Sequence, residues 1–265
     1  MQLADIEQAL SPLPLGDLRY LARTGSTNDD AARWADAGAS NLSLVVADEQ
    51  IAGHGRLGRN WFTPPGSALA FSLILKDLRS LPSFEGLERI TALGALGVCQ
   101  TLRDEYRLDA RIKWPNDVLV DRRKVCGVLT EATWQGEQLS SIILGIGVNV
   151  TPEAVPPEGE LAFPATCVET ALGRPVERLD LLRSILAHIL HWKNYLGRAE
   201  FVHAWDGWLA FKGEWVIIYT NPGAGVPQVR QGQVLGLDEQ GSLKLLDQNG
   251  KMFTQHAGEV RLRPV

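Results

Sequence analysis

Between residues 110 and 150 the chain consists of apolar segments joined by very short polar spacers. The segments are ARIKW, DVLVD, VCGVLTEATW and SSIILGIGVNV, and DRRK and QGEQ separate the last three. Spacers of this length are too short for the helical crossover that parallel strands require, but they suit hairpins. The sequence therefore predicts a sheet with much antiparallel pairing in this part of the chain.

The preceding and following segments predict helices and further strands. Residues 24–38 predict a helix, with Ser26 or Thr27 as its N-cap and Gly38 at its exit. The first 20 residues are expected to form a lead-in segment, which Pro12, Pro14 and Gly16 interrupt. Strands are predicted at LSLVVADEQ and ALAFSLIL, and helices over 84–106, 180–196 and 199–210.

From Gly213 the pattern changes to short strands separated by glycine, asparagine and aspartate turns. This spacing is typical of a small β-barrel or sandwich of SH3-like size. We therefore expect two domains, 1–212 and 213–265, with the boundary near Lys212. The smaller module is expected to serve activity rather than the folding of the larger domain.

Composition limits the classes of function. The 26 basic and 31 acidic residues give a formal net charge of −5, which does not support nucleic-acid binding through phosphate neutralisation. There is also no room before Arg23 for a helix-turn-helix module. Cys99, Cys126 and Cys167 form no CxxC pair, which favours a reduced, cytoplasmic protein. The N-terminus lacks the regions of a signal peptide, and no apolar run approaches the ~20 residues of a membrane span. We expect no nucleic-acid or membrane partner.

A basic, glycine-rich loop follows one of the predicted strands. It reads Gly53-His54-Gly55-Arg56-Leu57-Gly58-Arg59, and its arginines suit phosphate or carboxylate oxygens. Its glycines fit GxGxxG, but the WFTPP that follows cannot open the helix that a dinucleotide site requires. The alternative interpretation is a surface turn without a ligand.

The segment Lys113-Trp114-Pro115-Asn116-Asp117 separates two predicted strands. Pro115 interrupts strand pairing, which leaves the polar groups beside it available for a ligand. Lys113 offers a charge for a polyphosphate, and Asn116 and Asp117 offer acceptors for a ligand, a lysine or a magnesium ion. The alternative is a proline turn in which both side chains satisfy the backbone. Lys124 follows at the edge of an apolar strand, next to the space left by Gly127.

Together these motifs resemble the biotin protein ligase family. The matching pieces are Ser26-Thr27-Asn28, GHGRLGRNW, KWPND, KVCGVL and GIGVN, in the same order from about Arg23 onward. The resemblance implies an α+β fold with a mixed sheet flanked by helices, like the class II aminoacyl-tRNA synthetase core, and a C-terminal SH3-like barrel. It also implies the cofactors ATP, biotin and Mg²⁺, formation of biotinyl-5'-AMP, and transfer of biotin to a lysine of a biotin carboxyl carrier protein.

The resemblance also assigns roles to individual residues. Biotin binding falls to Ser26, Thr27, Gln50, Gly53, Gly55, Arg56, Lys124, Gly127 and Gly147, ATP or adenylate binding to Arg56, Arg59, Trp61, Lys113, Asn116 and Asn149, and catalysis to Arg56, Lys113, Lys124 and Asp117. Thr27 is alternatively only a helix cap, and Trp61 and Asn149 only packing or turn residues. His54 stands where the family usually has an arginine, which puts one phosphate or carboxylate contact in doubt. Metal ligands and the oligomeric state, monomer or homodimer, are left open.

Three other functions compete with this interpretation. A lipoate or octanoate ligase shares the core, but KWPND and RKVCGVL favour biotin. A biotin-sensing repressor needs a DNA-binding domain, for which we find neither room nor charge. A weak module that only holds the adenylate would lack biotin-dependent exchange of pyrophosphate with ATP. His188 and His191 share a helix face, but two ligands do not predict a zinc site.

Overall fold

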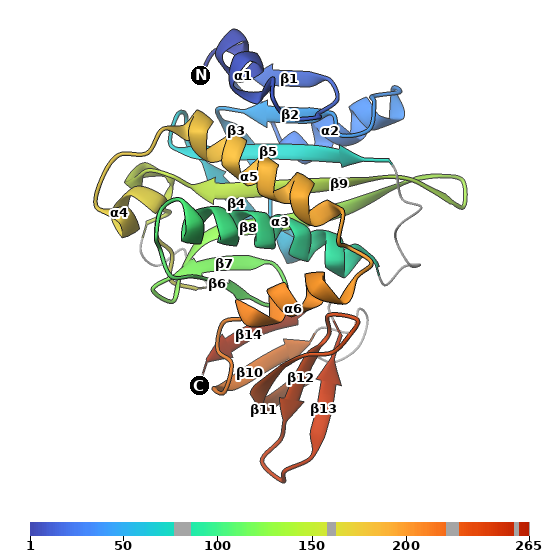
Figure 1. Ribbon diagram of the computed structural model, residues 1–265, viewed down its shortest axis with the longest axis vertical. Helices are drawn as coiled ribbons and strands as arrows, with labels where there is room; N and C mark the ends of the chain where they lie inside the picture. The colour runs from blue at the N-terminus through green and yellow to red at the C-terminus, as the bar shows by residue number, and fades with distance from the viewer. Residues whose placement is uncertain (77–85, 158–162, 221–227, 257–259, 265) are drawn as a thin grey trace.

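The computed structural model describes residues 1–76, 86–157, 163–220, 228–256 and 260–264 (Figure 1). Its centre is a seven-stranded sheet in the order β1-β2-β5-β9-β8-β7-β6. β1 pairs in parallel with β2, and every other neighbouring pair in this sheet is antiparallel. The mixed sheet is therefore confirmed. Its strands are β1 (Leu18–Leu21), β2 (Leu44–Ala47), β5 (Ala68–Leu75), β6 (Ala110–Lys113), β7 (Asp117–Val120), β8 (Arg123–Gln135) and β9 (Gln138–Asn149).

Helices cover both faces of this sheet. Helix α2 (Thr27–Asp36) buries Trp34 against Val45, Ile74 and Ile143, which point to one face. Helices α3 (Gly86–Asp104) and α5 (Arg178–Lys193) lie side by side across the other face (Figure 1). Successive side chains of a strand point to opposite faces, so buried strands such as β5 supply both hydrophobic layers.

Two short helices were not expected. The predicted lead-in contains α1 (Leu3–Leu10), which buries Ile6 and Leu10, and is followed by β1. The second is α4 (Val168–Leu172), which lies between β9 and α5 and whose exit is Gly173 in the left-handed conformation. Helix α1 was not predicted, whereas Pro12, Pro14 and Gly16 do interrupt the lead-in, between α1 and β1. Because α1 begins after Gln2, without a side-chain cap, no local start signal marks it.

A second, five-stranded antiparallel sheet follows α6 (Ala199–Gly207). Its order is β13-β12-β11-β10-β14, and across the described residues it is open between β13 and β14, so a closed SH3-like barrel stays a prediction. The indole of Trp114 donates to Gly241 O, and Arg122 pairs with Glu214, so this sheet is packed on the larger domain. The strands are β10 (Trp215–Thr220), β11 (Gln228–Leu237), β12 (Leu243–Leu246), β13 (Met252–Gln255) and β14 (Val260–Pro264).

The glycine-rich loop is the tip of a separate two-stranded hairpin. β3 (Gln50–His54) pairs antiparallel with β4 (Asn60–Thr63), and a 3-10 turn (Arg56–Gly58) lies between them. Gln50 also contacts Thr27 at the start of α2, which places the hairpin beside that helix. Within the described ranges, no helix is both long and apolar enough to cross a membrane.

Candidate active site

A pocket lies between the start of α2, the β3–β4 hairpin and the strands β8 and β9. It encloses about 50 Å³, room for only a few water molecules. Elements from four parts of the sequence therefore converge here. The lining residues are Ser26, Thr27, Asn28, Gln50, His54, Gly55, Arg56, Trp61, Asn116, Lys124, Gly127, Val128, Leu129, Gly145, Ile146 and Gly147.

Uncharged polar side chains form one wall of the pocket. The Thr27 N–H and hydroxyl lie 2.8 and 3.0 Å from Gln50 Oε1. Gln50 Nε2 donates in turn to Thr63. Ser26 is the N-cap residue of α2, but its side chain makes no capping hydrogen bond. Ser26 is therefore the N-cap by position, as predicted, but without a capping hydrogen bond, and the Thr27 hydroxyl bonds to Gln50 in the pocket wall.

Glycines make the opposite wall flat. Gly127 of β8 and Gly147 of β9 are direct partners in the sheet, and the Trp61 ring lies over both. A Cβ at Gly147 would lie 2.3 Å from the indole, which no packed side chain tolerates. Trp61 Nε1 is buried and has no hydrogen-bond partner among the described residues. An indole N–H of this kind is a donor available to a ligand oxygen.

A buried carboxylate holds two lysines at the pocket's edge. Asp117 lies 2.6 Å from Lys124 Nζ and 2.9 Å from Lys113 Nζ. Burial raises the pKa of Asp117, but the two ammonium groups outweigh burial and hold this pKa well below its usual range. Lys124 lines the pocket, with its ammonium 5.3 Å from the centre of the Trp61 ring. Lys113 is not among the lining residues and lies 4.5 Å from the centre of the Phe163 ring.

The tip of the hairpin adds Arg56 and His54 to the pocket lining. Arg56 Nη1 donates to Asn116 Oδ1 at 3.0 Å, and Asn116 Nδ2 donates to Val128 O. Burial lowers the pKa of Arg56, although the guanidinium remains charged. His54 Nδ1 lies 3.7 Å from Asp29 Oδ1 on the first turn of α2. An anion in this pocket would therefore face both Arg56 and Lys124.

Comparison with known proteins shows which family the chain belongs to. Residues 20–149 match the model of the Biotin/lipoate A/B protein ligase family. The biotin–[acetyl-CoA-carboxylase] ligase of Paracoccus denitrificans is 35% identical over 240 residues, which cover 87% of this chain and 95% of that protein. The chain belongs to the biotin protein ligase family.

Two further relatives match most of the length of this chain. The bifunctional ligase/repressor BirA of Bacillus subtilis is 30% identical over 240 residues, which cover 89% of this chain and 71% of that protein. The biotin protein ligase of Aquifex aeolicus, solved in complex with biotin and ATP, superposes with a TM-score of 0.79 at 29% identity. That match covers 94% of this chain and 99% of the Aquifex chain.

Most residues that the family resemblance assigned are gathered at the pocket. Ten of them line it, namely Ser26, Thr27, Gln50, Gly55, Arg56, Trp61, Asn116, Lys124, Gly127 and Gly147. Five do not line it. Lys113 and Asp117 form the buried ion pair behind Lys124, and Gly53 packs against Trp61. Asn149 donates to Thr166 O, and Arg59 is exposed, with its side chain hydrogen-bonded to Arg56 O.

Several lining residues had no role predicted from the sequence. Asn28 was quoted only as part of a motif, and Gly145 only as the start of GIGVN. The alternation of Gly145 with Gly147 was a usable signal, because residues two apart in a strand share a face. Ser72, which does not line the pocket but donates to Thr27 and Asn28, gave no signal because it lies within the apolar run of β5.

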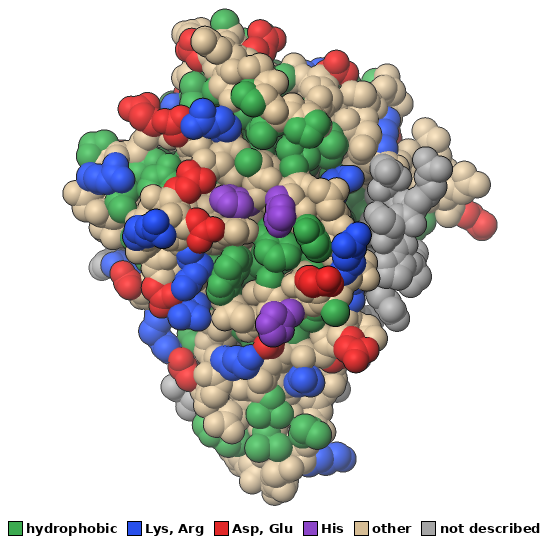
Figure 2. Space-filling view, in the orientation of Figure 1, with side chains coloured by type: hydrophobic (Ala, Val, Ile, Leu, Met, Phe, Trp, Pro, Cys, Tyr) green, Lys and Arg blue, Asp and Glu red, His purple; other side chains and the backbone are tan. Residues whose placement is uncertain are grey.

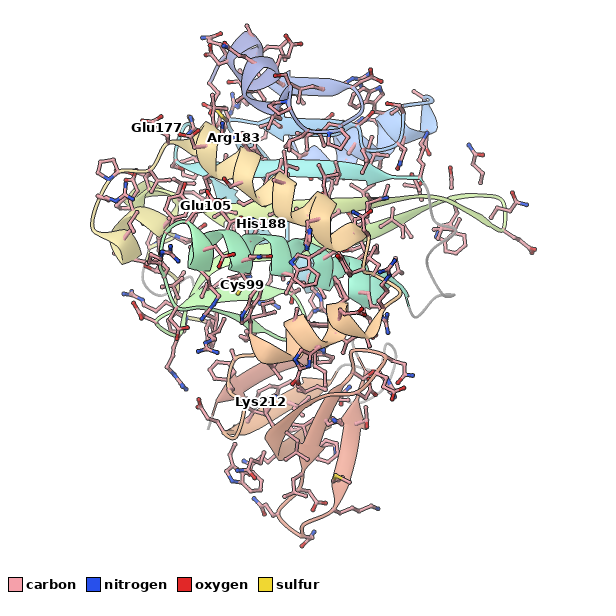
Figure 3. All side chains as sticks on the ribbon, in the orientation of Figure 1. Cys99, Glu105, Glu177, Arg183, His188 and Lys212 are labelled. Atoms are coloured by element: carbon pink, nitrogen blue, oxygen red, sulfur yellow. The ribbon has the colours of Figure 1, made fainter. Side chains whose placement is uncertain are left out.

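The helical face of the larger domain holds the histidines that the sequence analysis set aside. His188 of α5 points toward α3, and its Nδ1 lies 2.9 Å from Thr101 Oγ1 (Figure 3). Within the described ranges there is no group of three or more His, Cys, Asp or Glu side chains that would hold a metal ion. His188 is thus a packed and hydrogen-bonded residue.

Proposed function

We propose that this chain is a biotin protein ligase that activates biotin with ATP and transfers it to a lysine of a biotin carboxyl carrier protein. The observation that carries the proposal is the pocket itself, whose lining combines polar side chains, glycines and the two cations Lys124 and Arg56. The polar wall suits the ureido ring of biotin, and the two cations suit its carboxylate and the α-phosphate of ATP.

In the first half-reaction a biotin carboxylate oxygen attacks the α-phosphorus of ATP. The bond to the β-phosphate oxygen breaks, pyrophosphate leaves, and biotinyl-5'-AMP forms. The two reacting groups are both anionic, so the step needs preorganised positive charge. Lys124 supplies it from a fixed position, because Asp117 holds its ammonium group at 2.6 Å.

In the second half-reaction a lysine amine of the carrier attacks the acyl carbon of the adenylate. The C–O bond to AMP breaks, AMP leaves as an anion, and the amine loses a proton as the amide forms. The mixed anhydride must meanwhile be kept from water. The β3–β4 hairpin, whose residues Gly55, Arg56 and Trp61 line the pocket, is the element that covers it.

We propose that Mg²⁺ enters the site bound to ATP. Asp117, which was predicted as an acceptor for Mg²⁺, forms ion pairs with Lys113 and Lys124. Among the described residues there is also no group of three or more His, Cys, Asp or Glu side chains that would hold a metal ion. These residues do not fit a metal site of their own. We expect Mg²⁺ to be bound by the phosphates of ATP.

The remaining expectations also stay proposals. We propose a cytoplasmic enzyme with domains 1–212 and 213–265, an SH3-like C-terminal module, and a monomer or homodimer. We propose no nucleic-acid partner. Figure 2 supports this for one face, where acidic and basic side chains alternate over α3, α5 and α6 instead of forming a basic patch.

Lipoate is the alternative substrate within the same family. Its dithiolane ring has no N–H or carbonyl group, so it would leave the hydrogen-bonding groups of Ser26, Thr27, Asn28 and Gln50 without ligand partners. The test is thermal stabilisation by biotin against lipoate, followed by biotin-dependent exchange of pyrophosphate with ATP and transfer to a purified carrier domain. Stabilisation by lipoate alone, or no exchange with biotin, would refute the proposal.

A further inference from the structure

The C-terminal module contacts the larger domain at the turn between β11 and β12. This turn, residues 238–242, is fixed by its own hydrogen bonds. Asp238 Oδ1 accepts from the backbone N–H groups of Gln240 and Ser242, at 3.0 and 2.8 Å. Gly241 N donates to Asp238 O, and Asp238 N donates to Ser242 O. The shape of the turn is therefore held by Asp238 and by the backbone.

Three elements of the larger domain contact this turn. Arg89 of α3 donates from its guanidinium to Glu239 O at 2.5 Å. Gly241 has a φ of +92°, and a Cβ on it would lie 2.4 Å from the Trp205 ring of α6, so the turn is packed tightly on that ring. The third element is the KWPND segment.

Trp114 makes the contact from the KWPND segment. Its side chain is 1% exposed, and its Nε1 donates to Gly241 O at 3.1 Å. The segment joins β6 and β7, which form the edge of the central sheet next to the C-terminal module (Figure 1). A buried indole N–H without an acceptor is costly, so this hydrogen bond fixes Trp114 against the turn.

The residues that follow Trp114 in the segment hold the two cations of the pocket. Asn116 Oδ1 accepts from Arg56 at 3.0 Å, and Asp117 lies 2.6 Å from Lys124 Nζ. Among the residues that the structure describes, neither Trp114 nor any residue of the turn lines the pocket. The turn is thus connected to both cations through the KWPND segment, without lining the pocket itself.

We propose that the C-terminal module positions Arg56 and Lys124 for adenylate formation through the hydrogen bond between Trp114 and Gly241. This inference rests on the proposed function, because it names the half-reaction that the module serves. Trp114 is a positioning residue. A reacting group displaced by about 1 Å costs up to about 10²-fold in rate. Recognition of the biotin ring should not change, because the polar wall is supplied by α2 and β3.

Trp114→Phe is the first test, because it removes the indole N–H and keeps an aromatic ring. Biotin-dependent exchange of pyrophosphate with ATP is measured on the full chain, at saturating biotin and ATP and well below the Tm of every variant. Its kcat should fall by about tenfold, because the cations are less well placed. Kd for biotin, from titration calorimetry, should change by less than about threefold, as expected for an effect on the transition state alone.

Asp238 allows the same test from the C-terminal module. Asp238→Ala removes the acceptor of two backbone N–H groups and loosens the turn, whereas Asp238→Asn retains an oxygen there. Asp238→Ala should lower kcat as Trp114→Phe does, and Asp238→Asn should keep most of the wild-type rate. Because both changes break the same link, the double variant Trp114→Phe/Asp238→Ala should lose about tenfold rather than about 10²-fold.

Trp192→Phe is the matched control for the lost hydrogen bond. Trp192 Nε1 of α5 donates to Gln100 Oε1 of α3 at 2.6 Å, so this variant also loses an indole hydrogen bond, but with a partner outside the KWPND segment. Its Tm should fall, as that of Trp114→Phe should, because each leaves an acceptor without its donor. Its kcat should stay at the wild-type value.

The outcomes separate the inference from the function on which it rests. If the wild-type protein catalyses no biotin-dependent exchange, the proposed function fails. If it does, but Trp114→Phe lowers kcat no more than Trp192→Phe, or the losses in Trp114→Phe and Asp238→Ala multiply in the double variant, the module does not act through Trp114. A loss of biotin affinity as large as the loss in kcat would also refute the inference, since it would show a general disturbance of the pocket.

Discussion

Asp117 is the residue whose replacement tests the two-lysine cluster most directly. Asp117→Asn would leave the ammonium groups now 2.6 and 2.9 Å from the carboxylate without their shared negative partner. Removing one partner of a buried ion pair costs about 3–5 kcal/mol. At roughly 2–4 °C per kcal/mol for a domain of this size, the Tm should fall by roughly 6–20 °C.

The loss should depend on pH in a defined direction. The pKa of Asp117 is raised by burial but held well below its usual range by Lys124 and Lys113. A lowered folded-state pKa contributes stability that is complete above the unfolded-state value of about 3.9 and fades as pH falls through the folded-state value. The stability difference between the wild-type protein and Asp117→Asn should therefore be constant from about pH 5 to 8 and shrink below about pH 4.

Equilibrium unfolding in urea at several pH values measures this difference. Asp109→Asn is the control, because hydrogen bonds from Arg103 and Arg111 also lower the pKa of Asp109, but its side chain is 64% exposed. An exposed pair of this kind contributes less than about 1 kcal/mol. A loss in Asp117→Asn no larger than in the control, or one that does not shrink in acid, would refute the role of Asp117.

Three further predictions concern the pocket and the C-terminal module. Lys124→Ala should lower biotin-dependent pyrophosphate exchange by about 10²-fold or more, since one preorganised cation is lost, and near-normal exchange would contradict its role. His54→Arg should slow dissociation of biotinyl-5'-AMP by adding a permanent charge at the opening, and an unchanged rate would show that position 54 does not contact the ligand. A chain ending at Lys212 should still bind biotin but transfer it slowly, and should have a lower Tm because Trp114 and Trp205 lose their cover at Gly241. An unchanged Tm would contradict that packing.

The strands of the central sheet could be predicted from the sequence, but helix α1 at the N-terminus could not. The run 68–75 and the four segments after residue 110 are strands in the structure, because each combines buried apolar residues with short spacers. Helix α1 was missed because its eight residues bury only Ile6 and Leu10 and no capping residue precedes it. Its stability comes from tertiary contacts, which a local pattern does not contain.

In the site, too, the sequence predicts which residue types are present but not which side chains contact one another. Lys113 and Lys124 were both predicted to contact phosphate, and no local pattern distinguishes them. In the structure Lys113 and Asp117 are register partners on β6 and β7, so their side chains share a face and form a buried pair. Lys124 reaches the same carboxylate from β8 and remains in the pocket lining. Strand register, which depends on long-range pairing, assigns the two lysines different positions.

Register also explains why glycines from two separate motifs act together. Gly127 belongs to KVCGVL and Gly147 to GIGVN, and they become neighbours only because β8 and β9 pair in this register. The Trp61 ring rests on the flat surface that they share, and its unpartnered N–H lies in the pocket lining. Because the indole rests on this surface, any movement of Trp61 also moves the β3–β4 hairpin that carries it. The position of the glycine-rich loop and access to the surface of Gly127 and Gly147 are therefore linked through Trp61.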